Sequence, residues 1–276
     1  MALTQQEMTR FLLSARKLAA MRLGRSVRVS HYGEQGVIAR QVAALPPELR
    51  VCVDIGASDG VSGSNTLPLF RAGWAGLAVE MDGPAFGLLA VVLARHRGVA
   101  VSRLQVTPEN VVSLLCAHGI PREFGLLSLD IDGYDHFVLD AVLAQYRPRL
   151  IVAEINEKVP PPLHFTVNWS PHYRYLGDHF YGQSLSAVAD LAERHGYVLT
   201  EVHYNNAFLT PVEHFEGAAP SVALAYRRGY AERPDRLRRF PWNTRFEPLQ
   251  RMAPEAAAAW LDDFFSARRG EYQLSL

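Results

Sequence analysis

The stretch that most constrains this chain is Val51–Thr66, VCVDIGASDGVSGSNT, in which an apolar run meets an acidic residue and then a glycine-rich turn. Four of its first five residues are apolar or β-branched, a pattern typical of a central parallel strand that is covered on both faces. The glycines allow the backbone to pass close to a ligand, and the next helix is expected to begin near Asn65. The stretch therefore predicts an α/β fold whose first strand ends at a nucleotide-binding loop.

The chemistry of this loop distinguishes between nucleotide ligands. From Asp54 to Gly60 it reads D-x-G-x-x-D-G, and it lacks the third glycine that the dinucleotide fingerprint places three residues after a G-x-G pair. The carboxylates of Asp54 and Asp59 would also repel a pyrophosphate. Acidic side chains suit a ligand that carries an ammonium group, a sulfonium and ribose hydroxyls, so the loop favours S-adenosylmethionine (SAM) over NAD.

The net charge and composition of the chain limit the kinds of molecule that it is expected to bind. The 276 residues have a formal net charge of zero, so there is no electrostatic case for nucleic acid or for an anionic membrane, and we expect a small-molecule partner. The apolar content of 49% is enough for a sizeable core. The two cysteines, Cys52 in the apolar run and Cys116 in a helical stretch, predict no disulfide framework and favour a cytoplasmic location.

The N-terminal segment, Leu3–Leu23, has apolar residues at helical spacing. Because Arg10, Arg16 and Lys17 interrupt it, it lacks the continuous apolar run of a signal peptide or a membrane span. We expect an amphipathic helix that acts as a lid or as a homodimer contact, although packing on the chain's own core explains the pattern equally well.

Strand and helix patterns alternate after this segment. Further strands are expected at Gly76–Glu80, Val99–Gln105, Phe124–Asp130 and Leu150–Asn156, followed by a hairpin of Tyr197–His203 and Ala207–Thr210. Helices are expected within Ser30–Ala44 and at Pro84–Arg97, Pro108–Gly119, His136–Tyr146, Gln183–His195 and Pro254–Arg268. Between them, Val159–Tyr181 is rich in proline and aromatic residues without a clear period, which predicts a substrate loop or lid.

Polar residues recur where the expected parallel strands end. Glu80 ends the second strand, Asp130 the fourth, and Glu154 and Asn156 the fifth. Ligands of open α/β sheets bind at the carboxyl ends of the strands, and an acidic residue after the second strand suits a ribose diol. We therefore expect Glu80 to bind ribose and the later acids to take part in chemistry.

The motifs YGEQGVI, DIGASDGVSGSNT, LAVEMD, VTPENV, LLSLDIDGYDHFVL, IVAEIN, YGQSLSAVADLAERHGY and NNAFLT occur in this order over Ser30–Thr210. In combination they resemble the FkbM-like family of SAM-dependent methyltransferases. The resemblance implies a class I methyltransferase fold, an α/β doubly wound, Rossmann-like sheet of seven strands with one antiparallel strand. It also implies a methyltransferase domain at 30–228, between an N-terminal helical extension at 1–29 and a C-terminal extension with a helix at 229–276.

The resemblance also implies a set of residues that bind the donor. The loop would line the methionine part of SAM, Glu80 would accept from the ribose hydroxyls, and the segment from Gln105 to Thr107 would flank adenine. The complete set comprises Tyr32, Gln35, Asp54, Gly56, Ala57, Ser58, Asp59, Asn65, Glu80, Met81, Gln105, Val106, Thr107 and Asp130. The alternative is a structural turn with solvated acids, and for Gln35 a plain role at the start of its helix.

Two further roles concern the acceptor. Metal-dependent relatives of this fold bind a divalent ion with acids at the ends of the fourth and fifth strands, so Asp130, Glu154 and Asn156 are candidate ligands of Mg²⁺ or Mn²⁺. In the alternative interpretation, Asp130 or Asp132 caps the following helix through Gly133, and Glu154 pairs with an arginine. We expect Asp130 and His179 to be catalytic, with His179 as the base because it lies in the long loop; His31, His172 and His203 are the other candidates.

The sequence thus predicts a SAM-dependent methyltransferase that methylates a hydroxyl of a small natural product or a sugar-bearing metabolite. Methylation of nitrogen or carbon needs the same cleft and stays open. A SAM-binding module without catalysis is the alternative from another class, although acids at several strand ends argue against it. A nicotinamide-dependent oxidoreductase is disfavoured by the glycine spacing.

Overall fold

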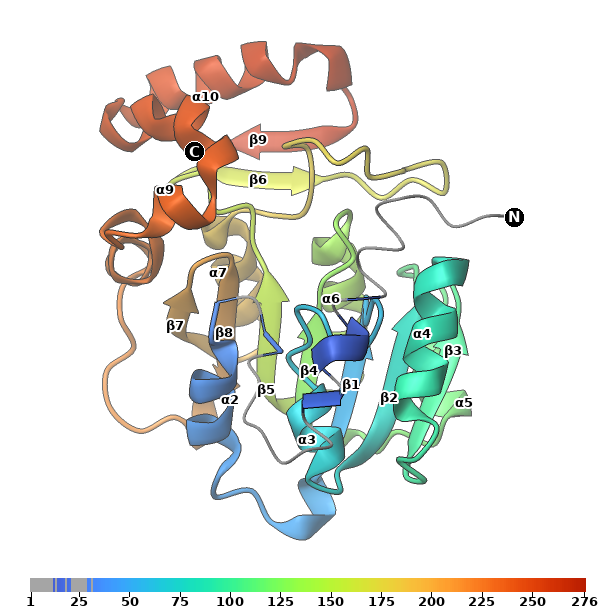
Figure 1. Ribbon diagram of the computed structural model, residues 1–276. Helices are drawn as coiled ribbons and strands as arrows, with labels where there is room; N and C mark the ends of the chain where they lie inside the picture. Colours follow the sequence, from blue (N-terminus) through green and yellow to red (C-terminus); the bar gives the residue numbers. More distant parts are fainter. Residues whose placement is uncertain (1–11, 13, 18, 21–28, 31) are drawn as a thin grey trace. The chain divides into compact units, whose positions relative to one another are not determined.

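The structure, a computed structural model, describes residues 12, 14–17, 19–20, 29–30 and 32–276 (Figure 1). Most of the expected N-terminal helix lies outside the described residues; those of its residues that are described are helical. Its expected role as a lid or dimer contact therefore stays a prediction. Within the described part of the chain, no helix is both long and apolar enough to cross a membrane, and Cys52 and Cys116 are free thiols.

Seven strands form the main sheet, in the order β3-β2-β1-β4-β5-β8-β7. They are β1 (Val51–Ile55), β2 (Ala75–Glu80), β3 (Val99–Arg103), β4 (Glu123–Leu129), β5 (Arg147–Glu154), β7 (Tyr197–His203) and β8 (Asn206–Pro211). β8 is antiparallel to both of its neighbours, whereas β1, β2 and β3 pair in parallel. This is the mixed sheet of a class I methyltransferase fold, so the predicted fold class is confirmed.

Helices separate most of these strands along the chain. They are α2 (Glu34–Val42), α3 (Leu67–Arg71), α4 (Gly83–Leu93), α5 (Val111–Ala117), α6 (Asp135–Leu143), α7 (Leu185–Arg194), α8 (Val222–Tyr226), α9 (Arg236–Arg239) and α10 (Pro254–Phe264). Short 3₁₀ turns lie at Pro47–Leu49, Val212–His214 and Ser266–Arg268, a longer one at Pro241–Arg251, and a π-helical turn at Arg227–Ala231. The predicted helices are present, mostly one to four residues shorter than the sequence pattern indicated.

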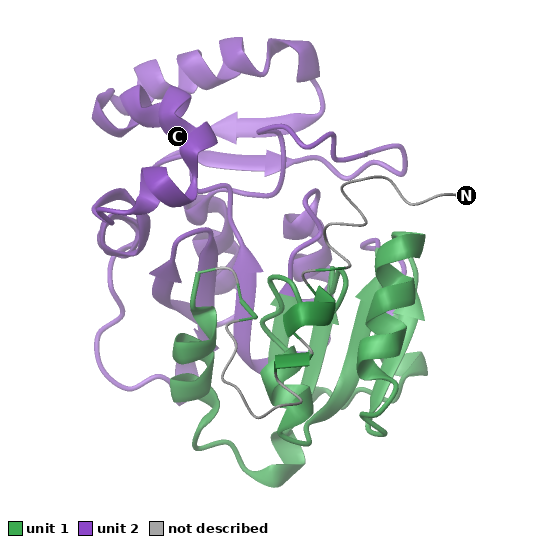
Figure 2. Cartoon of the chain, viewed as in Figure 1, with its two compact units in different colours: residues 1–106, 113–128 green, residues 107–112, 129–276 purple. Residues whose placement is uncertain are grey.

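The chain divides into two compact units (Figure 2). Unit 1 comprises Met1–Val106 and Ser113–Ser128, and unit 2 comprises Thr107–Val112 and Leu129–Leu276. The division falls inside the segment 30–228 that the sequence assigned to the methyltransferase domain. It therefore does not test the predicted boundaries at residues 29/30 and 228/229, which stay predictions.

Unit 1 is built on the predicted central strand. Cys52, Val53 and Ile55 of β1 are fully buried, as expected for a strand covered on both faces, and α4 packs on β2 and β3. Gly76 of β2 lies beside Cys52, and a Cβ atom at this position would lie 1.8 Å from the Cys52 carbonyl oxygen. Only glycine permits this approach of the two strands.

Unit 2 contains the antiparallel part of the sheet. β8 pairs with β5 from Ile151–Leu209 to Glu154–Asn206, and β7 pairs with β8 as the predicted hairpin. α7 begins at Leu185, where the Ser184 hydroxyl accepts from the backbone N–H of Ala187. The apolar side of α7 packs on β7 and β8.

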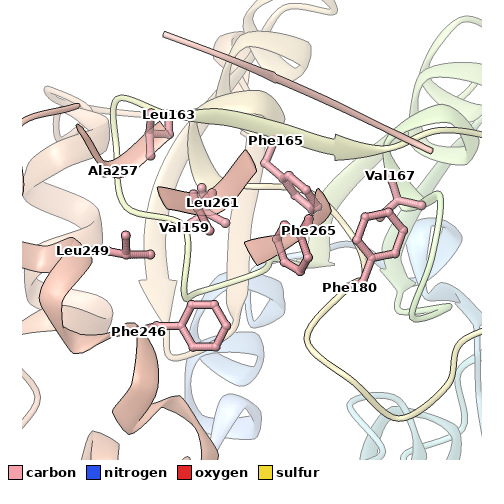
Figure 3. Close-up of a cluster of buried hydrophobic side chains, with 10 residues drawn as sticks. All are labelled: Val159, Leu163, Phe165, Val167, Phe180, Phe246, Leu249, Ala257, Leu261 and Phe265. Carbon is pink, nitrogen blue, oxygen red and sulfur yellow. The ribbon is translucent and has the colours of Figure 1, made fainter. Parts of the chain in front are cut away.

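A second, two-stranded sheet in unit 2 differs from the sequence prediction. β6 (His164–Val167) lies inside the segment expected to be a loop, and it pairs antiparallel with β9 (Tyr272–Ser275) near the end of the chain. Side chains of β6, of the turn Pro241–Arg251, of α10 and of the segments beside them form a hydrophobic cluster, against which Tyr272 and Leu274 of β9 pack. Its buried residues are Val159, Leu163, Phe165, Val167, Phe180, Phe246, Leu249, Ala257, Leu261 and Phe265 (Figure 3). The C-terminal segment therefore packs on the expected substrate loop.

Candidate functional site

The predicted donor loop of unit 1 has the backbone geometry that its glycines suggested. Gly56 and Gly60 adopt φ angles of 90° and 74°, and Ser58 adopts 50°. The backbone N–H groups of Gly56 and Ala57 both donate to the Val79 carbonyl oxygen, which fixes the loop to the end of β2. The conformation therefore depends on residues that tolerate positive φ.

Glu80, the predicted ribose acceptor, is bound to this loop. Its Oε2 accepts from the backbone N–H of Ser58 at 2.8 Å, and its Oε1 accepts from the backbone N–H of Asp82 at 2.7 Å. Each carboxylate oxygen can accept a further hydrogen bond. The structure thus brings together Glu80 and the loop as expected, with the carboxylate held in place before any ligand binds.

Asp54 is a buried carboxyl at the end of β1. The Thr66 hydroxyl donates to its Oδ2, and burial raises the pKa of the Asp54 carboxyl from 3.8 to about 6, with the nearby charge of Glu80 adding to the effect. Hydrogen bonds from Thr66 and Ser128 oppose this shift. A buried carboxyl that feels the charge of a second carboxylate favours a cationic ligand.

Asp59 shapes the loop through its side chain. Its Oδ1 accepts from the backbone N–H groups of Val61 and Ser62 at 2.8 and 2.7 Å, and the Ser14 hydroxyl donates to its Oδ2. These contacts hold the turn around Gly60, where a Cβ atom would lie 2.7 Å from a methyl group of Leu89. Any contribution of Asp59 to donor binding would therefore act through the shape of the loop.

Gln35 and Asn65 carry buried polar atoms that lack a partner. Gln35 Nε2 and Asn65 Oδ1 have no hydrogen-bond partner in the described part of the chain. α3 begins after Asn65, because the Ser64 hydroxyl accepts from the backbone N–H of Leu67. Ser30 Oγ is a third such atom of unit 1. Buried polar groups are almost always satisfied, so these atoms are candidates for contact with a polar ligand.

The remaining predicted donor residues are placed as follows. The Met81 side chain is 48% exposed and Val106 is buried. The side chain of Tyr32 is half-buried, and its backbone N–H donates to Glu34. Gln105 is half-buried in unit 1, whereas Thr107 belongs to unit 2, where its backbone N–H donates to Asn110 Oδ1.

Unit 2 contains a cluster of three carboxylates. Oxygens of Asp130, Asp132 and Glu154 lie within 4.8 Å of one another. Burial, together with the charges of Asp130 and Asp132, raises the pKa of Glu154 well above its ordinary value. Carboxylates this close repel one another unless a proton or a cation lies between them, and an all-oxygen set suits Mg²⁺ or Mn²⁺.

The loop that carries Asp132 is held by Asp135. Asp135 is fully buried, and its two oxygens accept from the backbone N–H groups of Ile131 and Gly133, each at 2.9 Å. Asp132 adopts a φ of 53°, which is uncommon for a residue other than glycine. The sequence suggested Asp130 or Asp132 for such a structural role, but Asp135 performs it, and Asp132 belongs to the acid cluster.

Asn156, the third predicted metal ligand, has its amide nitrogen engaged elsewhere. Asn156 Nδ2 donates to the carbonyl oxygens of His179 and Tyr181, both at 3.0 Å. Its Oδ1 is buried and has no partner among the described residues. Of the three predicted ligands the structure thus brings together Asp130 and Glu154, and it adds Asp132, whose side chain the sequence did not single out for this role.

His179 lies against aromatic side chains of the C-terminal segment. Its ring centroid is 4.6 Å from that of Phe246 and 6.1 Å from that of Phe264. Burial, and then the charge of Lys158, lowers the pKa of His179, so the imidazole is neutral at neutral pH and can accept a proton. Burial, and then the charges of Asp132 and Glu154, raises the pKa of the Tyr175 hydroxyl.

A buried network beside this region was not foreseen. Lys158 is 1% exposed, and its Nζ donates to the Tyr181 hydroxyl at 2.7 Å; that hydroxyl donates to Glu157 Oε2 at 2.9 Å. Asn243 of the C-terminal segment donates to Glu157 Oε1. Because charged residues are normally exposed, composition gave no signal for this network.

Comparison with known proteins found similarity to solved structures only. A protein assigned as an O-methyltransferase from Klebsiella pneumoniae aligns over 76% of this chain and 90% of its own, with 16% identity and a TM-score of 0.45. Magnesium protoporphyrin IX methyltransferase from Synechocystis, crystallised with S-adenosylhomocysteine, aligns over 74% and 98%, with 13% identity and a TM-score of 0.40. Precorrin-6y C5,15-methyltransferase from Geobacter metallireducens aligns over 67% and 92%, with 17% identity and a TM-score of 0.38. No family model and no curated protein matches the sequence, and these structural neighbours are methyltransferases of several kinds.

Proposed function

We propose that this chain is a SAM-dependent methyltransferase of the FkbM-like kind, acting on a hydroxyl of a small natural product or a sugar-bearing metabolite. The observation that carries the proposal is that unit 1 holds the Glu80 carboxylate together with orphaned buried polar atoms, among them Gln35 Nε2 and Asn65 Oδ1. A donor, an acceptor and a fixed carboxylate suit a ligand that has a carboxylate, an ammonium group and a ribose diol. SAM combines these three groups.

In this proposal each polar group of unit 1 binds one part of the donor. Gln35 Nε2 donates to the methionine carboxylate, and Asn65 Oδ1 accepts from the ammonium group. Glu80 accepts from the ribose hydroxyls with the lone pairs that Ser58 and Asp82 leave free. The buried carboxyl of Asp54 favours the cationic form of the ligand.

The acceptor chemistry is assigned to unit 2. Asp130, Asp132 and Glu154 fit a divalent cation, since their oxygens lie close together and Glu154 Oε2 is buried without a hydrogen-bond partner in the described chain. Asn156 is a candidate for a further ligand through its orphaned Oδ1. When bound, Mg²⁺ or Mn²⁺ lowers the pKa of an acceptor hydroxyl.

The transfer itself is an in-line displacement at carbon. The acceptor oxygen forms a bond to the methyl carbon, the bond between this carbon and the sulfonium sulfur breaks, and S-adenosylhomocysteine leaves. The hydroxyl proton passes to a base, for which we propose the neutral imidazole of His179. Alignment of the two reactants supplies much of the rate in such a step.

Three experiments separate this proposal from its rivals. Calorimetric titration with SAM, S-adenosylhomocysteine and NADH distinguishes a methyltransferase from a nicotinamide-dependent enzyme, which would bind NADH alone. Transfer of a labelled methyl group to a panel of hydroxylated small molecules, with amine and carbon acceptors alongside, distinguishes O-methylation from the other kinds. SAM binding without methyl transfer to any of these acceptors would favour a non-catalytic module. Methyl transfer that proceeds undiminished in EDTA would show that the reaction needs no divalent metal.

A further inference from the structure

The two oxygens of Glu154 have different surroundings. Oε1 accepts from the side-chain amide of Asn205 at 2.9 Å, whereas Oε2 is buried and lacks a hydrogen-bond partner among the residues that the structure describes. The Glu154 side chain is only 6% exposed. One oxygen is thus fixed by a neutral donor, and Glu154 contributes one carboxylate oxygen to the cluster with Asp130 and Asp132.

Asn205 is itself held rigidly at the turn between β7 and β8. Its carbonyl oxygen accepts from the backbone N–H of Ile155 at 2.8 Å, and its side-chain Oδ1 accepts from Asn206 Nδ2 at 3.3 Å. The preceding residue, Tyr204, adopts a φ of 55° and donates its backbone N–H to Gly229. Hydrogen bonds of Tyr204, Asn205 and Asn206 thus hold the turn, which lies next to β5 (Figure 1).

The hairpin register brings this amide to the acid cluster. Asn206 pairs with Glu154 in the antiparallel ladder between β5 and β8, so Asn205 lies one residue beyond the last paired position. At that point its side chain reaches the carboxylate of Glu154, and its backbone continues the contact with β5 through Ile155. A two-strand hairpin, distant in sequence from Asp130, thereby supports the cluster.

We propose that Asn205 is a positioning residue for a divalent cation: by binding Glu154 Oε1 it orients Oε2 toward the oxygens of Asp130 and Asp132. This inference rests on the metal-assisted form of the proposed function. Without the amide donor, the Glu154 carboxylate is free to rotate about its last torsion, and the cluster is no longer preorganised. Removal of such an outer partner typically lowers metal affinity by about 10- to 100-fold.

The test is a Mn²⁺ titration of the full chain without SAM, with free Mn²⁺ followed by electron paramagnetic resonance. The variants are Asn205→Ala and Asn205→Leu; both remove the donor, and leucine retains most of the volume. Asn168→Ala is the matched control, because the Asn168 amide also donates a side-chain hydrogen bond in unit 2, to the carbonyl oxygen of Gly270 instead of a carboxylate. Circular dichroism confirms that each variant is folded.

We expect both Asn205 variants to bind Mn²⁺ about 10- to 100-fold more weakly than the wild type, while Asn168→Ala binds it unchanged. Equal Mn²⁺ affinity of the wild type and of either folded Asn205 variant would overturn the proposal, as would a wild type that binds no Mn²⁺. Titration of the same samples with SAM distinguishes failure of the positioning role of Asn205 from failure of the proposed methyltransferase function. Loss of the positioning effect with intact SAM binding refutes this inference alone, whereas absence of SAM binding refutes the proposed function.

Discussion

The buried Asp54 carboxyl makes the stability of the protein depend on pH in a direction that can be worked out. Because burial raises its pKa from 3.8 to about 6, the native state binds the proton more tightly than the unfolded chain does. Ionisation of Asp54 costs no stability below its pKa in the unfolded chain, 3.8, and its full cost applies above its pKa in the native state, about 6. The free energy of unfolding therefore falls as the pH rises between these two values. At about 1.4 kcal/mol per pKa unit, the cost is about 3 kcal/mol at pH 7.5 and about 1.5 kcal/mol at pH 5.

The substitution Asp54→Asn removes this ionisation. Its effect on the hydrogen bond from Thr66 does not depend on pH, so the difference between two pH values isolates the charge. We expect the free energy of unfolding of the variant, relative to the wild type, to rise by about 1.5 kcal/mol between pH 5 and pH 7.5. Urea denaturation followed by circular dichroism at both pH values measures it.

The same variant is expected to bind SAM more weakly, because the charge that destabilises the fold is the one that favours the cationic donor. Asp82→Asn, at an exposed carboxyl that caps α4 in the same unit, reports the general effect of removing one negative charge. If the relative stability of Asp54→Asn stays constant or falls between pH 5 and pH 7.5, the account of Asp54 as an ionised, desolvated group is wrong.

Three further predictions concern the donor site and unit 2. Glu80→Gln should raise the dissociation constant of SAM by about 10- to 100-fold, the worth of a charge-assisted hydrogen bond, and unchanged affinity in calorimetry would exclude Glu80 from the site. Lys158→Met should lower the free energy of unfolding by about 3–5 kcal/mol, because it leaves the buried Glu157 carboxylate without a cationic partner. The double variant with Glu157→Gln should lose less stability, and an equal or larger loss would contradict the pairing. Phe165→Ala should cost about 3–5 kcal/mol in urea denaturation, since Phe165 is fully buried against Phe180 and Phe265; a loss below about 1 kcal/mol would mean that the cluster does not stabilise unit 2.

The main sheet could be predicted because its strands carry strong local signals. β1 and β4 are apolar runs buried on both faces, and each ends at an acidic residue or a turn. The acids at the ends of β2, β4 and β5 followed from the same pattern, since parallel strands place their carboxyl ends at one edge. Glu80, Asp130 and Glu154 were therefore identified from the sequence as candidate site residues.

The second sheet could not be predicted because its signals are short and distant. β6 and β9 have four residues each, and the pairing of Val167 with Tyr272 joins segments that are far apart in the chain. Four residues are too few for a period to be recognised, and the prolines around β6 favoured a loop. The tertiary partner, rather than local propensity, makes this segment a strand.

The hydrogen-bond partners of the polar side chains near the strand ends could not be predicted from the sequence for a different reason. Asp132, Asp135 and Asn156 were all visible as polar residues near strand ends, but which of them shapes a loop and which joins a cluster depends on side-chain direction. Asp135 binds backbone N–H groups, Asp132 joins the acids, and the Asn156 amide binds carbonyl oxygens. Asn205 was visible only as a turn residue, and its bond to Glu154 requires the hairpin register.

The decisive measurement for donor binding is calorimetric titration of the purified chain with S-adenosylhomocysteine, the spent form of the donor. The account predicts saturable binding of one molecule per chain, weakened by Glu80→Gln. A chain that is folded by circular dichroism and yet shows no saturable binding of this ligand would contradict the account.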